Sequence, residues 1–357
     1  MNTGYPDIRL NGKPYGRQAL FQHCNDKEWL GSADPATSQI FQFICEWLNE
    51  KKDITLFTSG STGDPKKVKL LKHHMIQSAL MTQKFFDLNE NKTALLCLPT
   101  EYIAGKMMIV RAFVTGCNLI TVPPSANPFK RIKQAIDFAA LTPYQLFHSL
   151  KDIRRLNVRQ IIIGGGEMPA ELEKKTALIR SDIFATYGMT ETCSHVALRK
   201  ANGKDATDIY AALKGISFRQ DERECLIVDA PMLSHHQIVT NDLVELIDDG
   251  HFRWLGRYDN VINTGGIKVF PEAIEKKIYR LINRPFFISS AKDSELSEKV
   301  IIVVEGTPYT QDQESWLVQQ FRKILTRYEN PKEFLYIDKF IYSESGKILR
   351  KKTLQQT

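Results

Sequence analysis

The sequence lacks any apolar run that approaches the roughly 20 residues needed for a membrane-spanning helix. Residues 1–7 also lack the apolar segment of a secretory signal peptide. We therefore expect a cytosolic (cytoplasmic) protein without membrane insertion. Internal repeats and low-complexity linkers are absent as well, so the sequence gives no sign of a repeat architecture.

Cysteine is sparse, and a long basic block is missing. The six cysteines form no C-x-x-C pair, so neither a zinc site nor a disulfide framework is predicted. We expect reduced core residues at these positions: Cys24, Cys45, Cys97, Cys117, Cys193 and Cys225. The formal charge of +7 comes from Lys and Arg spread along the chain without an aromatic-studded basic motif. Small polyanions explain this charge as well as nucleic acid does, and we expect no nucleic-acid partner.

The chain does contain enough apolar residues for a sizeable core. Its 357 residues are 43% hydrophobic, a length and composition that suggest two or more domains. Short apolar runs alternate with helical patterns in the middle of the chain. We expect strands over residues 93–98, 119–122, 160–163 and 183–186, and helices over 129–140 and 170–179. Such alternation predicts an α/β fold with a largely parallel sheet, in which ligands bind beyond the strand ends.

After Leu198 the sequence changes to short strands separated by turns, which predicts a smaller β-rich subdomain. The expected strands cover residues 225–228, 237–240 and 243–247, and a turn is expected at 248–250. Beyond Arg257 we predict a compact α+β segment. It contains a helix after Pro271, strands near 286–289 and 300–304, and a helix over 312–327. The predicted domains are 1–258 and 259–357, with the boundary at Asp259.

The most informative segment is the loop that directly follows the apolar run 54–57. Its residues are Thr58, Ser59, Gly60, Ser61, Thr62, Gly63, Asp64, Pro65 and Lys66. Backbone N–H groups and short hydroxyls after a buried strand converge on phosphate oxygens, and a lysine adds a mobile positive charge. A Walker loop is excluded, because Asp64 and Pro65 stand where that motif begins a helix with Lys-Ser/Thr. A polar surface turn is the alternative. The whole pattern favours a triphosphate site made of Thr58, Ser59, Gly60, Ser61, Thr62, Gly63 and Lys66.

This loop resembles the phosphate loop of the adenylate-forming enzymes, a superfamily of acyl-CoA synthetases, luciferases and peptide-synthetase adenylation domains. Three further segments resemble motifs of the family in the same order: Tyr187-Gly188-Met189-Thr190-Glu191, Gly256-Arg257-Tyr258-Asp259 with residues 265–269, and Ser345-Gly346-Lys347-Ile348. The resemblance implies a large layered α/β domain followed by a small mobile α+β domain. It also implies ATP, Mg²⁺ and coenzyme A as cofactors. The family usually has more chain before the phosphate loop, so we expect a shortened first subdomain.

The resemblance implies an adenine and ribose site as well. Gly164, Gly165, Gly166 and Glu167 match the adenine slot, where glycines let a flat ring approach the backbone. On its own this segment favours a plain strand-to-helix turn, and Pro169 excludes the dinucleotide fingerprint. The remaining matches are Tyr187, which stacks on the base beside Gly188, Asp242, which accepts bonds from the ribose hydroxyls, and Arg257, its usual companion. Asn241 departs from the glycine that usually precedes this aspartate.

Three residues match the catalytic positions of the family. Thr190 meets the α-phosphate, and Glu191 holds Mg²⁺, since a hard cation needs only one carboxylate besides phosphates and water. An exposed Thr-Glu pair at a helix start is the alternative. Lys347 lies in a glycine-flanked tip and, by resemblance, bridges the substrate carboxylate and the nucleotide. A solvated lysine is the alternative.

The second half-reaction is also assigned by resemblance. The C-terminal domain turns about the hinge residue Asp259. This motion presents Lys347 for adenylation and the loop of Gly265, Gly266 and Lys268 for attack by coenzyme A. Glycines in this loop leave room for a pantetheine arm.

The acyl substrate is predicted from residues 98–111. Tyr102, Gly105 and Lys106 occupy the acyl-pocket motif of the family, and Arg111 is suited to pair with a second substrate carboxylate. A basic residue on a solvated helix face is the alternative. This pattern, the small size and the reduced N-terminus most resemble the o-succinylbenzoate-CoA ligases of menaquinone biosynthesis.

Three alternatives stay open at this point: another acyl- or aryl-CoA ligase, an adenylating enzyme that loads a carrier protein, and a non-catalytic nucleotide-binding protein. The last is disfavoured because a binding module has little need of Lys347. We expect small-molecule partners, namely a carboxylic acid, ATP and coenzyme A. A homo-oligomer is compatible with the sequence, which carries no motif for it.

Overall fold

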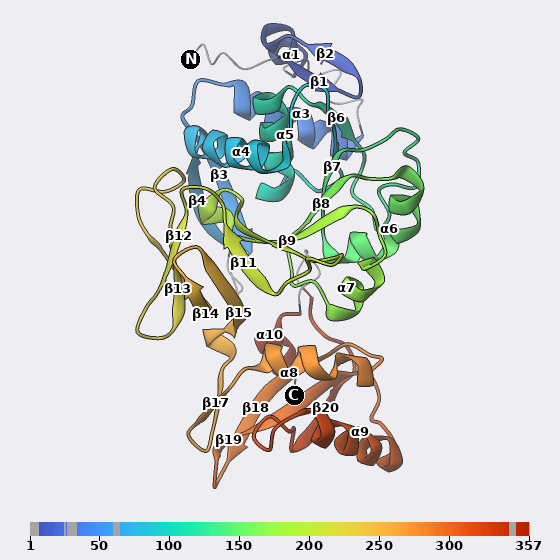
Figure 1. The fold of residues 1–357 in the computed structure, drawn as a ribbon, viewed down its shortest axis with the longest axis vertical. Helices are drawn as coiled ribbons and strands as arrows, with labels where there is room; N and C mark the ends of the chain where they lie inside the picture. The colour runs from blue at the N-terminus through green and yellow to red at the C-terminus, as the bar shows by residue number, and fades with distance from the viewer. Residues whose placement is uncertain (1–6, 25, 27–33, 60–64, 343–347, 357) are drawn as a thin grey trace. The chain divides into compact units, whose positions relative to one another are not determined.

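The computed structural model describes residues 7–24, 26, 34–59, 65–342 and 348–356 (Figure 1). The chain falls into two units, each of which we describe by itself. Unit 1 comprises Met1–Phe218, Val228–Ile238 and Asp249–His251, and unit 2 comprises Arg219–Ile227, Val239–Asp248 and Phe252–Thr357. The boundary at Asp259 stays a prediction.

Unit 1 is built on a sheet of mostly parallel strands. These are β1 (Ile8–Leu10), β2 (Lys13–Tyr15), β5 (Thr93–Leu96), β6 (Asn118–Thr121), β7 (Phe138–Leu141), β8 (Gln160–Ile163), β9 (Asp182–Gly188), β10 (His195–Lys200) and β11 (Ile209–Ala212). Neighbouring strands follow the order β11-β10-β9-β8-β7-β5-β6-β1-β2. The pairs from β6 through β5, β7 and β8 to β9 are parallel, whereas β10 pairs antiparallel with β9. The predicted α/β class is confirmed.

The helices of unit 1 are α1 (Arg17–Cys24), α3 (Pro35–Leu48), α4 (Lys72–Phe86), α5 (Ile103–Thr115), α6 (Pro143–Leu156) and α7 (Ala170–Thr176). Local sequence sets their ends. For example, Thr142 and Gln145 form a capping box at the start of α6, and Asn157 ends that helix in the left-handed conformation. In the part of the chain that the structure describes, no helix is long and apolar enough to cross a membrane.

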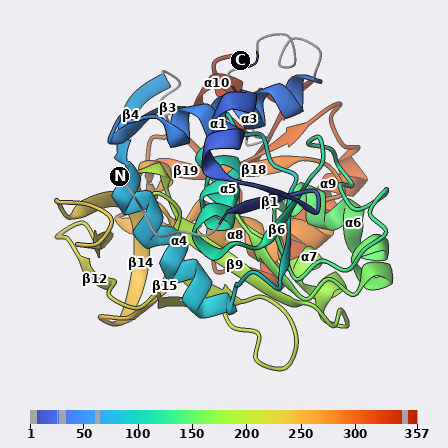
Figure 2. The ribbon, with the colours of Figure 1, turned by 90° about the horizontal axis from the view of Figure 1, so that it is seen from above.

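Helix α5 is enclosed by the rest of unit 1. Every residue from Gly105 to Thr115 is buried, because the segment is apolar on almost all sides. Helix α4 packs beside α5 in both views (Figure 1, Figure 2). A basic side chain on α5 is therefore placed in the interior, which bears on the predicted acyl site.

The predicted helix over residues 129–140 is wrong. A turn covers residues 128–131, and strand β7 (Phe138–Leu141) lies between β5 and β8. Ile132 and Ile136 have helical spacing, but both pack into the core beside the sheet as part of an irregular connection. A central parallel strand is buried on both faces and reads as a continuous apolar run, which periodicity cannot distinguish from a buried helix.

The β-rich segment that was predicted after Leu198 forms a run of neighbouring strands. They are β12 (Ser217–Gln220), β13 (Cys225–Asp229), β14 (Ile238–Asp248) and β15 (His251–Arg257). Strand β12 is divided equally between the two units, and the larger parts of the other three belong to unit 2. The two strands expected at 237–240 and 243–247 are one strand, β14. The expected turn follows it, at Asp249 and Gly250.

The remainder of unit 2 is the α+β segment that the sequence predicts. Its strands are β16 (Ile262–Thr264), β17 (Ile267–Val269), β18 (Phe286–Asp293), β19 (Ser297–Glu305) and β20 (Glu333–Ile337), and its helices are α8 (Pro271–Ile278), α9 (Gln311–Ile324) and α10 (Arg350–Leu354). Strand β19 is central: it pairs antiparallel with β18 and β16 and parallel with β20. Apolar side chains of α8 and α9 pack on it, including Ile274, Ile278, Leu317 and Phe321.

Candidate functional site

A two-stranded ribbon carries the ends of the predicted phosphate loop. Strands β3 (Asp53–Ser59) and β4 (Pro65–Leu71) are antiparallel, with Thr58 opposite Lys66 and Ser59 opposite Pro65. A strand thus follows the loop where a Walker motif would begin a helix. The predicted phosphate ligands Gly60, Ser61, Thr62 and Gly63 lie outside the described residues. All phosphate assignments in this loop stay predictions.

The predicted adenine slot and Tyr187 are brought to the same edge of the sheet. Gly164, Gly165 and Gly166 follow β8, Tyr187 lies near the end of β9, and these two strands are parallel neighbours. The Oγ1 of Thr186 donates to the carbonyl of Ile163 at 3.0 Å and fastens the two strand ends together. This is the edge at which open α/β sheets bind their ligands. Glu167 is exposed just beyond it.

An aromatic partner of Tyr187 was not found from the sequence. The ring of Tyr210 lies edge-on to that of Tyr187, with the ring centroids 6.0 Å apart. Arg199 covers Tyr210 from the other strand, with its guanidinium carbon 5.5 Å from the ring centroid. Burial raises the pKa of Tyr210. Tyr210 thus packs against the edge of Tyr187, and no motif marks Tyr210 because it lies on another strand, β11.

The predicted catalytic pair Thr190 and Glu191 sits in a short 3-10 helix, Thr190–Thr192, directly after β9. The Oγ1 of Thr192 accepts a bond from the backbone N–H of Met189 at 3.0 Å, which holds this turn closed. Both predicted residues are half-buried. A carboxylate is a hard oxygen donor, so Glu191 fits a Mg²⁺ ion that takes its other ligands from phosphate and water.

Gly188 is required by the close approach of two backbone segments. A Cβ added to it would lie 2.5 Å from the Cα of His195 and closer still to the carbonyl oxygen of Ser194. The approach occurs where the register between β9 and β10 shifts by a bulge. Real Cβ atoms do not come this near to backbone, so any larger residue must displace β10.

We expect Gly188→Ala to lower the free energy of unfolding by about 1–3 kcal/mol, the usual cost of overpacking a site that cannot relax. Gly166→Ala is the matched control, because a Cβ there meets no atom within 4 Å. Its effect should stay within about 0.5 kcal/mol. Urea unfolding of both variants measures the difference, and equal stabilities would contradict the steric explanation.

The predicted ribose aspartate lies in a network within unit 2. Asp242 is nearly buried on β14, and its Oδ1 accepts from Arg257 Nη1 at 3.3 Å and from the indole N–H of Trp254 at 3.4 Å. Burial lowers the pKa of Arg257, but the charges of Asp242 and Asp259 outweigh it, so the net shift is upward. The structure therefore brings Asp242 and Arg257 together. Trp254 was missed, because no motif residue marks its position on β15.

The hinge residue Asp259 belongs to the same network. Its Oδ2 accepts from Arg257 Nη2 and from the Nδ2 of Asn241, both at 3.3 Å. The Oδ1 of Asn241 in turn accepts from Arg223 Nη1 at 3.0 Å. Asn241, which stands where the family usually has glycine, thus links β14, the strand of the predicted ribose aspartate, to the predicted hinge residue Asp259.

The predicted thioester loop is the turn between β16 and β17. Gly265 and Gly266 both adopt the left-handed region, with φ of 58° and 81°. A Cβ added to Gly266 would meet no atom within 4 Å, so the backbone there is open on that side. The ammonium of Lys268 is 2.9 Å from Glu224. Lys347 lies outside the described residues.

The predicted acyl residues are all on or next to α5. Tyr102 occupies the N-cap position of α5 without a side-chain cap bond. A Cβ on Gly105 would lie 2.7 Å from the carbonyl carbon of Pro99, so this glycine allows the helix to pack against the preceding loop. The ammonium of Lys106 lies 3.4 Å from Glu46 and 4.3 Å from the ring centroid of Phe43. Burial lowers the pKa of Lys106, and Glu46 opposes this shift.

Arg111 is the unusual charge of this region, since its side chain is only 2% exposed. Its Nη2 donates to Ser194 Oγ at 2.6 Å and its Nε to Thr82 Oγ1 at 3.3 Å. His195 lies against the same hydroxyls, with Nε2 3.3 Å from Thr82 Oγ1. Burial lowers the pKa of Arg111 to about 10, and the pKa of His195 is lowered by burial and then by Arg111.

No ion pair joins Arg111 to a carboxylate among the residues that the structure describes. Its polar partners there are two hydroxyls and the thioether of Met108. A buried cation without a counter-charge is costly, and such groups are usually paired. Arg111 on a solvated face, the alternative raised by the sequence, is therefore wrong. Thr82, Ser194 and His195 were missed because neutral hydroxyl and imidazole neighbours have no sequence signature.

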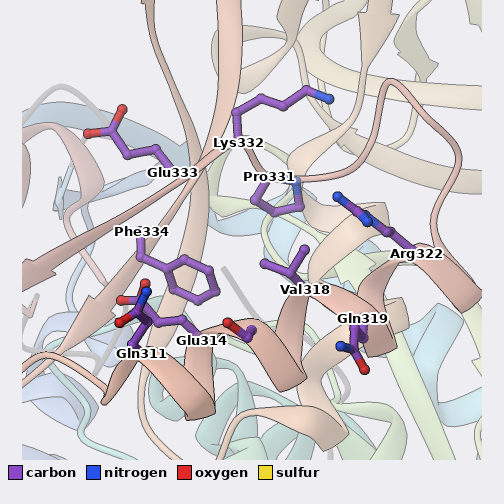
Figure 3. Close-up of a pocket in the computed structure, with 10 residues that line it drawn as sticks. Gln311, Glu314, Val318, Gln319, Arg322, Pro331, Lys332, Glu333 and Phe334 are labelled. Carbon is purple, nitrogen blue, oxygen red and sulfur yellow. The ribbon is translucent and has the colours of Figure 1, made fainter.

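A hollow of about 640 Å³ lies elsewhere, on α9 and the strand β20 of unit 2 (Figure 3). It is lined by Gln311, Glu314, Ser315, Val318, Gln319, Arg322, Pro331, Lys332, Glu333 and Phe334. None of these residues belongs to the predicted site. We therefore assign the hollow no part in the predicted site.

The chain is similar in sequence to known enzymes. The model of the family described as AMP-binding enzyme matches residues 49–231. A 2-succinylbenzoate–CoA ligase of Salmonella typhimurium is 25% identical over 330 residues, which cover 88% of this chain and 70% of that protein. A probable 2-succinylbenzoate–CoA ligase of Mycobacterium tuberculosis is 27% identical over 311 residues, which cover 78% and 80% of the two chains.

Solved structures are similar as well. An acyl-CoA synthetase (AMP-forming)/AMP-acid ligase II-like protein from Dyadobacter fermentans has 31% identity and a TM-score of 0.60, over 96% of this chain and 98% of that one. The o-succinylbenzoate CoA synthetase of Bacillus subtilis, solved with its acyl-adenylate, has 20% identity and a TM-score of 0.69, over 84% and 69% of the two chains. The second likeness shows the fold alone.

Proposed function

This chain belongs to the AMP-binding enzyme family, and on that premise we propose that it is an ATP-dependent acid–CoA ligase whose acid is o-succinylbenzoate. The observation that carries the choice of acid is Arg111, a buried guanidinium whose described polar partners are all neutral. An acid with a second carboxylate, left over after the first has reacted, would give such a cation its counter-charge.

The relatives' names support the same acid. Those of Salmonella typhimurium and Mycobacterium tuberculosis are 2-succinylbenzoate–CoA ligases or probable ones, at 25% and 27% identity. The product would serve menaquinone biosynthesis, as the resemblance implies. Arg111 and these names together support o-succinylbenzoate as the acid.

The reaction we propose has two steps at one site. In the first, a carboxylate oxygen of the acid attacks the α-phosphorus of ATP, the bond to the bridging oxygen breaks, and pyrophosphate leaves with the electron pair. In the second, the coenzyme A thiolate attacks the acyl carbon, and AMP leaves. Both steps gather negative charge, so this chain must supply cations and N–H donors where that charge develops.

We assign these roles to the residues as follows. Thr58, Ser59, Lys66 and the loop between them hold the β- and γ-phosphates, and Thr190 binds the α-phosphate. Tyr187, packed against Tyr210, covers the adenine, and Asp242 accepts the ribose hydroxyls while Arg257 and Trp254 hold its carboxylate in place. When bound, Mg²⁺ supplies positive charge to the departing pyrophosphate, and Glu191 is the residue that would hold it.

The two steps are assigned to two orientations of the predicted domain 259–357 about Asp259. Lys347 serves the first step, and the turn of Gly265 and Gly266 admits the pantetheine arm in the second. The bonds from Arg257 and Asn241 to Asp259 support this assignment, because they hold the hinge carboxylate to the strand that carries Asp242. We also propose a cytoplasmic location, where ATP and coenzyme A are both present.

We expect pyrophosphate release from ATP and Mg²⁺ with o-succinylbenzoate, and CoA thioester only when coenzyme A is added. The measurement is pyrophosphate release over a panel of mono- and dicarboxylic acids, with mass detection of the adenylate and the thioester. A preference for another acid would support the ligase activity but contradict the choice of o-succinylbenzoate as its substrate. Adenylate without thioester would favour a carrier-loading enzyme, and silence across the panel would favour a non-catalytic nucleotide-binding protein.

A further inference from the structure

Three histidines from distant parts of the sequence meet in unit 1. His73 and His74 lie in the first turn of α4, and His235 lies in the segment between β13 and β14. Their ligand nitrogens all lie within 4.8 Å of one another. The ring centroid of His74 is 4.0 Å from that of His73 and 5.0 Å from that of His235. None of the three belongs to the site proposed above.

His73 and His74 follow Lys72, whose positive charge is bound by another element. Leu71 is extended at the N-cap, so the helix begins only at Lys72. The ammonium of Lys72 is directed to Asn49, with Nζ 2.8 Å from its carbonyl oxygen and 2.9 Å from its Oδ1. The positive charge next to the histidines in sequence is thus bound by another element, and it does not occupy the space between the rings.

The distances suit a metal ion held by imidazole nitrogens. With Zn–N bonds of about 2.05 Å at the tetrahedral angle, ligand nitrogens are about 3.3 Å apart. In the structure the ligand nitrogens are at most 4.8 Å apart, so each pair must approach by at most about 1.5 Å to bind one ion. His73 and His235 are exposed and can rotate toward the buried His74.

The chemistry of the three donors selects the ion. Imidazole suits Zn²⁺, Cu²⁺ and Ni²⁺, whereas Mg²⁺ prefers carboxylate, phosphate and water oxygens. Mg²⁺ supplied for ATP therefore does not compete for this position. Three protein ligands leave a fourth position of a tetrahedral ion for water, which the exposure of His73 and His235 allows.

We propose that His73, His74 and His235 form a binding site for one divalent transition-metal ion of the Zn²⁺ class. The bound ion ties the beginning of α4 to the segment between β13 and β14. Strand β4 runs directly into α4, so the ion also braces the ribbon that carries Lys66. The site is separate from Glu191, and its occupancy is independent of the acid that the enzyme uses.

The test is equilibrium dialysis of the full-length, tag-free protein against Zn²⁺, followed by metal analysis. We expect one Zn²⁺ per chain for the wild type, and loss of that ion in His73→Ala and in His235→Ala. Both residues are exposed, so neither variant depends on refilling a core. His236→Ala is the matched control: this exposed neighbour is outside the cluster, and the variant should keep the ion.

A second readout separates this site from other Zn²⁺ ligands such as the cysteines. Co²⁺ bound in place of Zn²⁺ gives visible absorption whose intensity reports a four-coordinate site, and this signal should vanish in His235→Ala. Zn²⁺ should also raise the Tm of the wild type and of His236→Ala, but not that of the other two variants. No bound ion in the wild type, or binding at the wild-type level in His73→Ala and His235→Ala, would overturn the proposal.

Discussion

Replacing Lys347 with alanine is expected to lower the rate of adenylate formation by about 10²- to 10³-fold, the usual effect of removing one well-placed stabilising group from a transition state. In the proposed mechanism this lysine neutralises charge only while the acid carboxylate and the α-phosphate are brought together. Attack of coenzyme A on a supplied acyl-adenylate should therefore stay close to the wild-type rate.

The measurement follows the two half-reactions separately. Pyrophosphate release reports the first, and thioester formation from added acyl-adenylate reports the second. Lys352→Ala is the control, since this lysine is exposed on α10, a few residues away, and has no assigned role. If Lys347→Ala slowed both half-reactions equally, Lys347 would not be specific to the first. If adenylate formation kept the wild-type rate, Lys347 would have no part in the mechanism.

The elements that the sequence predicted well are those with a strong local signal. Strands β8 and β9 and helices α8 and α9 were each expected close to their observed positions, because periodicity and flanking turn residues agree there. The helix over residues 129–140 failed for the opposite reason. Its apolar residues belong partly to a buried parallel strand, and only the neighbours β5 and β8 decide between the two structures.

The site residues, too, divide into those that sequence motifs identified and those that only the structure revealed. Asp242 and Arg257 were named from ordered motifs, and the structure brings them together. Trp254, Tyr210 and Asn241 complete the surroundings through contacts between strands, which a linear motif cannot encode. The assignments of Lys347 and Gly60, Ser61, Thr62 and Gly63 rest on the sequence alone.

The enclosure of α5 changes the meaning of Arg111. From the sequence it was either a surface cation or a substrate ligand, and the burial of residues 105–115 removes the first option. Its guanidinium reaches Ser194, which is only part-buried and lies three residues beyond Glu191 in the chain. Arg111 is therefore connected by one hydroxyl to the turn that carries the proposed Mg²⁺ ligand.

Arg111→Gln is expected to reduce kcat/KM for o-succinylbenzoate by about 30-fold or more. Losing one partner of a buried charge pair costs about 2–5 kcal/mol, and each 1.36 kcal/mol is a factor of about ten. 4-Oxo-4-phenylbutanoate lacks the ring carboxylate. With this acid the wild type should have a low kcat/KM, and the kcat/KM of the variant should be only slightly lower. Arg111→Lys should recover only part of the loss, because lysine keeps the charge but not the bidentate fork.

The comparison of two acids in one variant separates recognition from folding. A buried substitution that merely loosened unit 1 would lower turnover of both acids by the same factor, and Tm would fall with it. Recognition by Arg111 predicts instead that the ratio of the two kcat/KM values moves toward one, because the ring carboxylate loses its counter-charge while the adenylating residues stay in place. An unchanged ratio would leave Arg111 as a structural cation held by Thr82 and Ser194, and the choice of acid would then have to be made by other residues of the site.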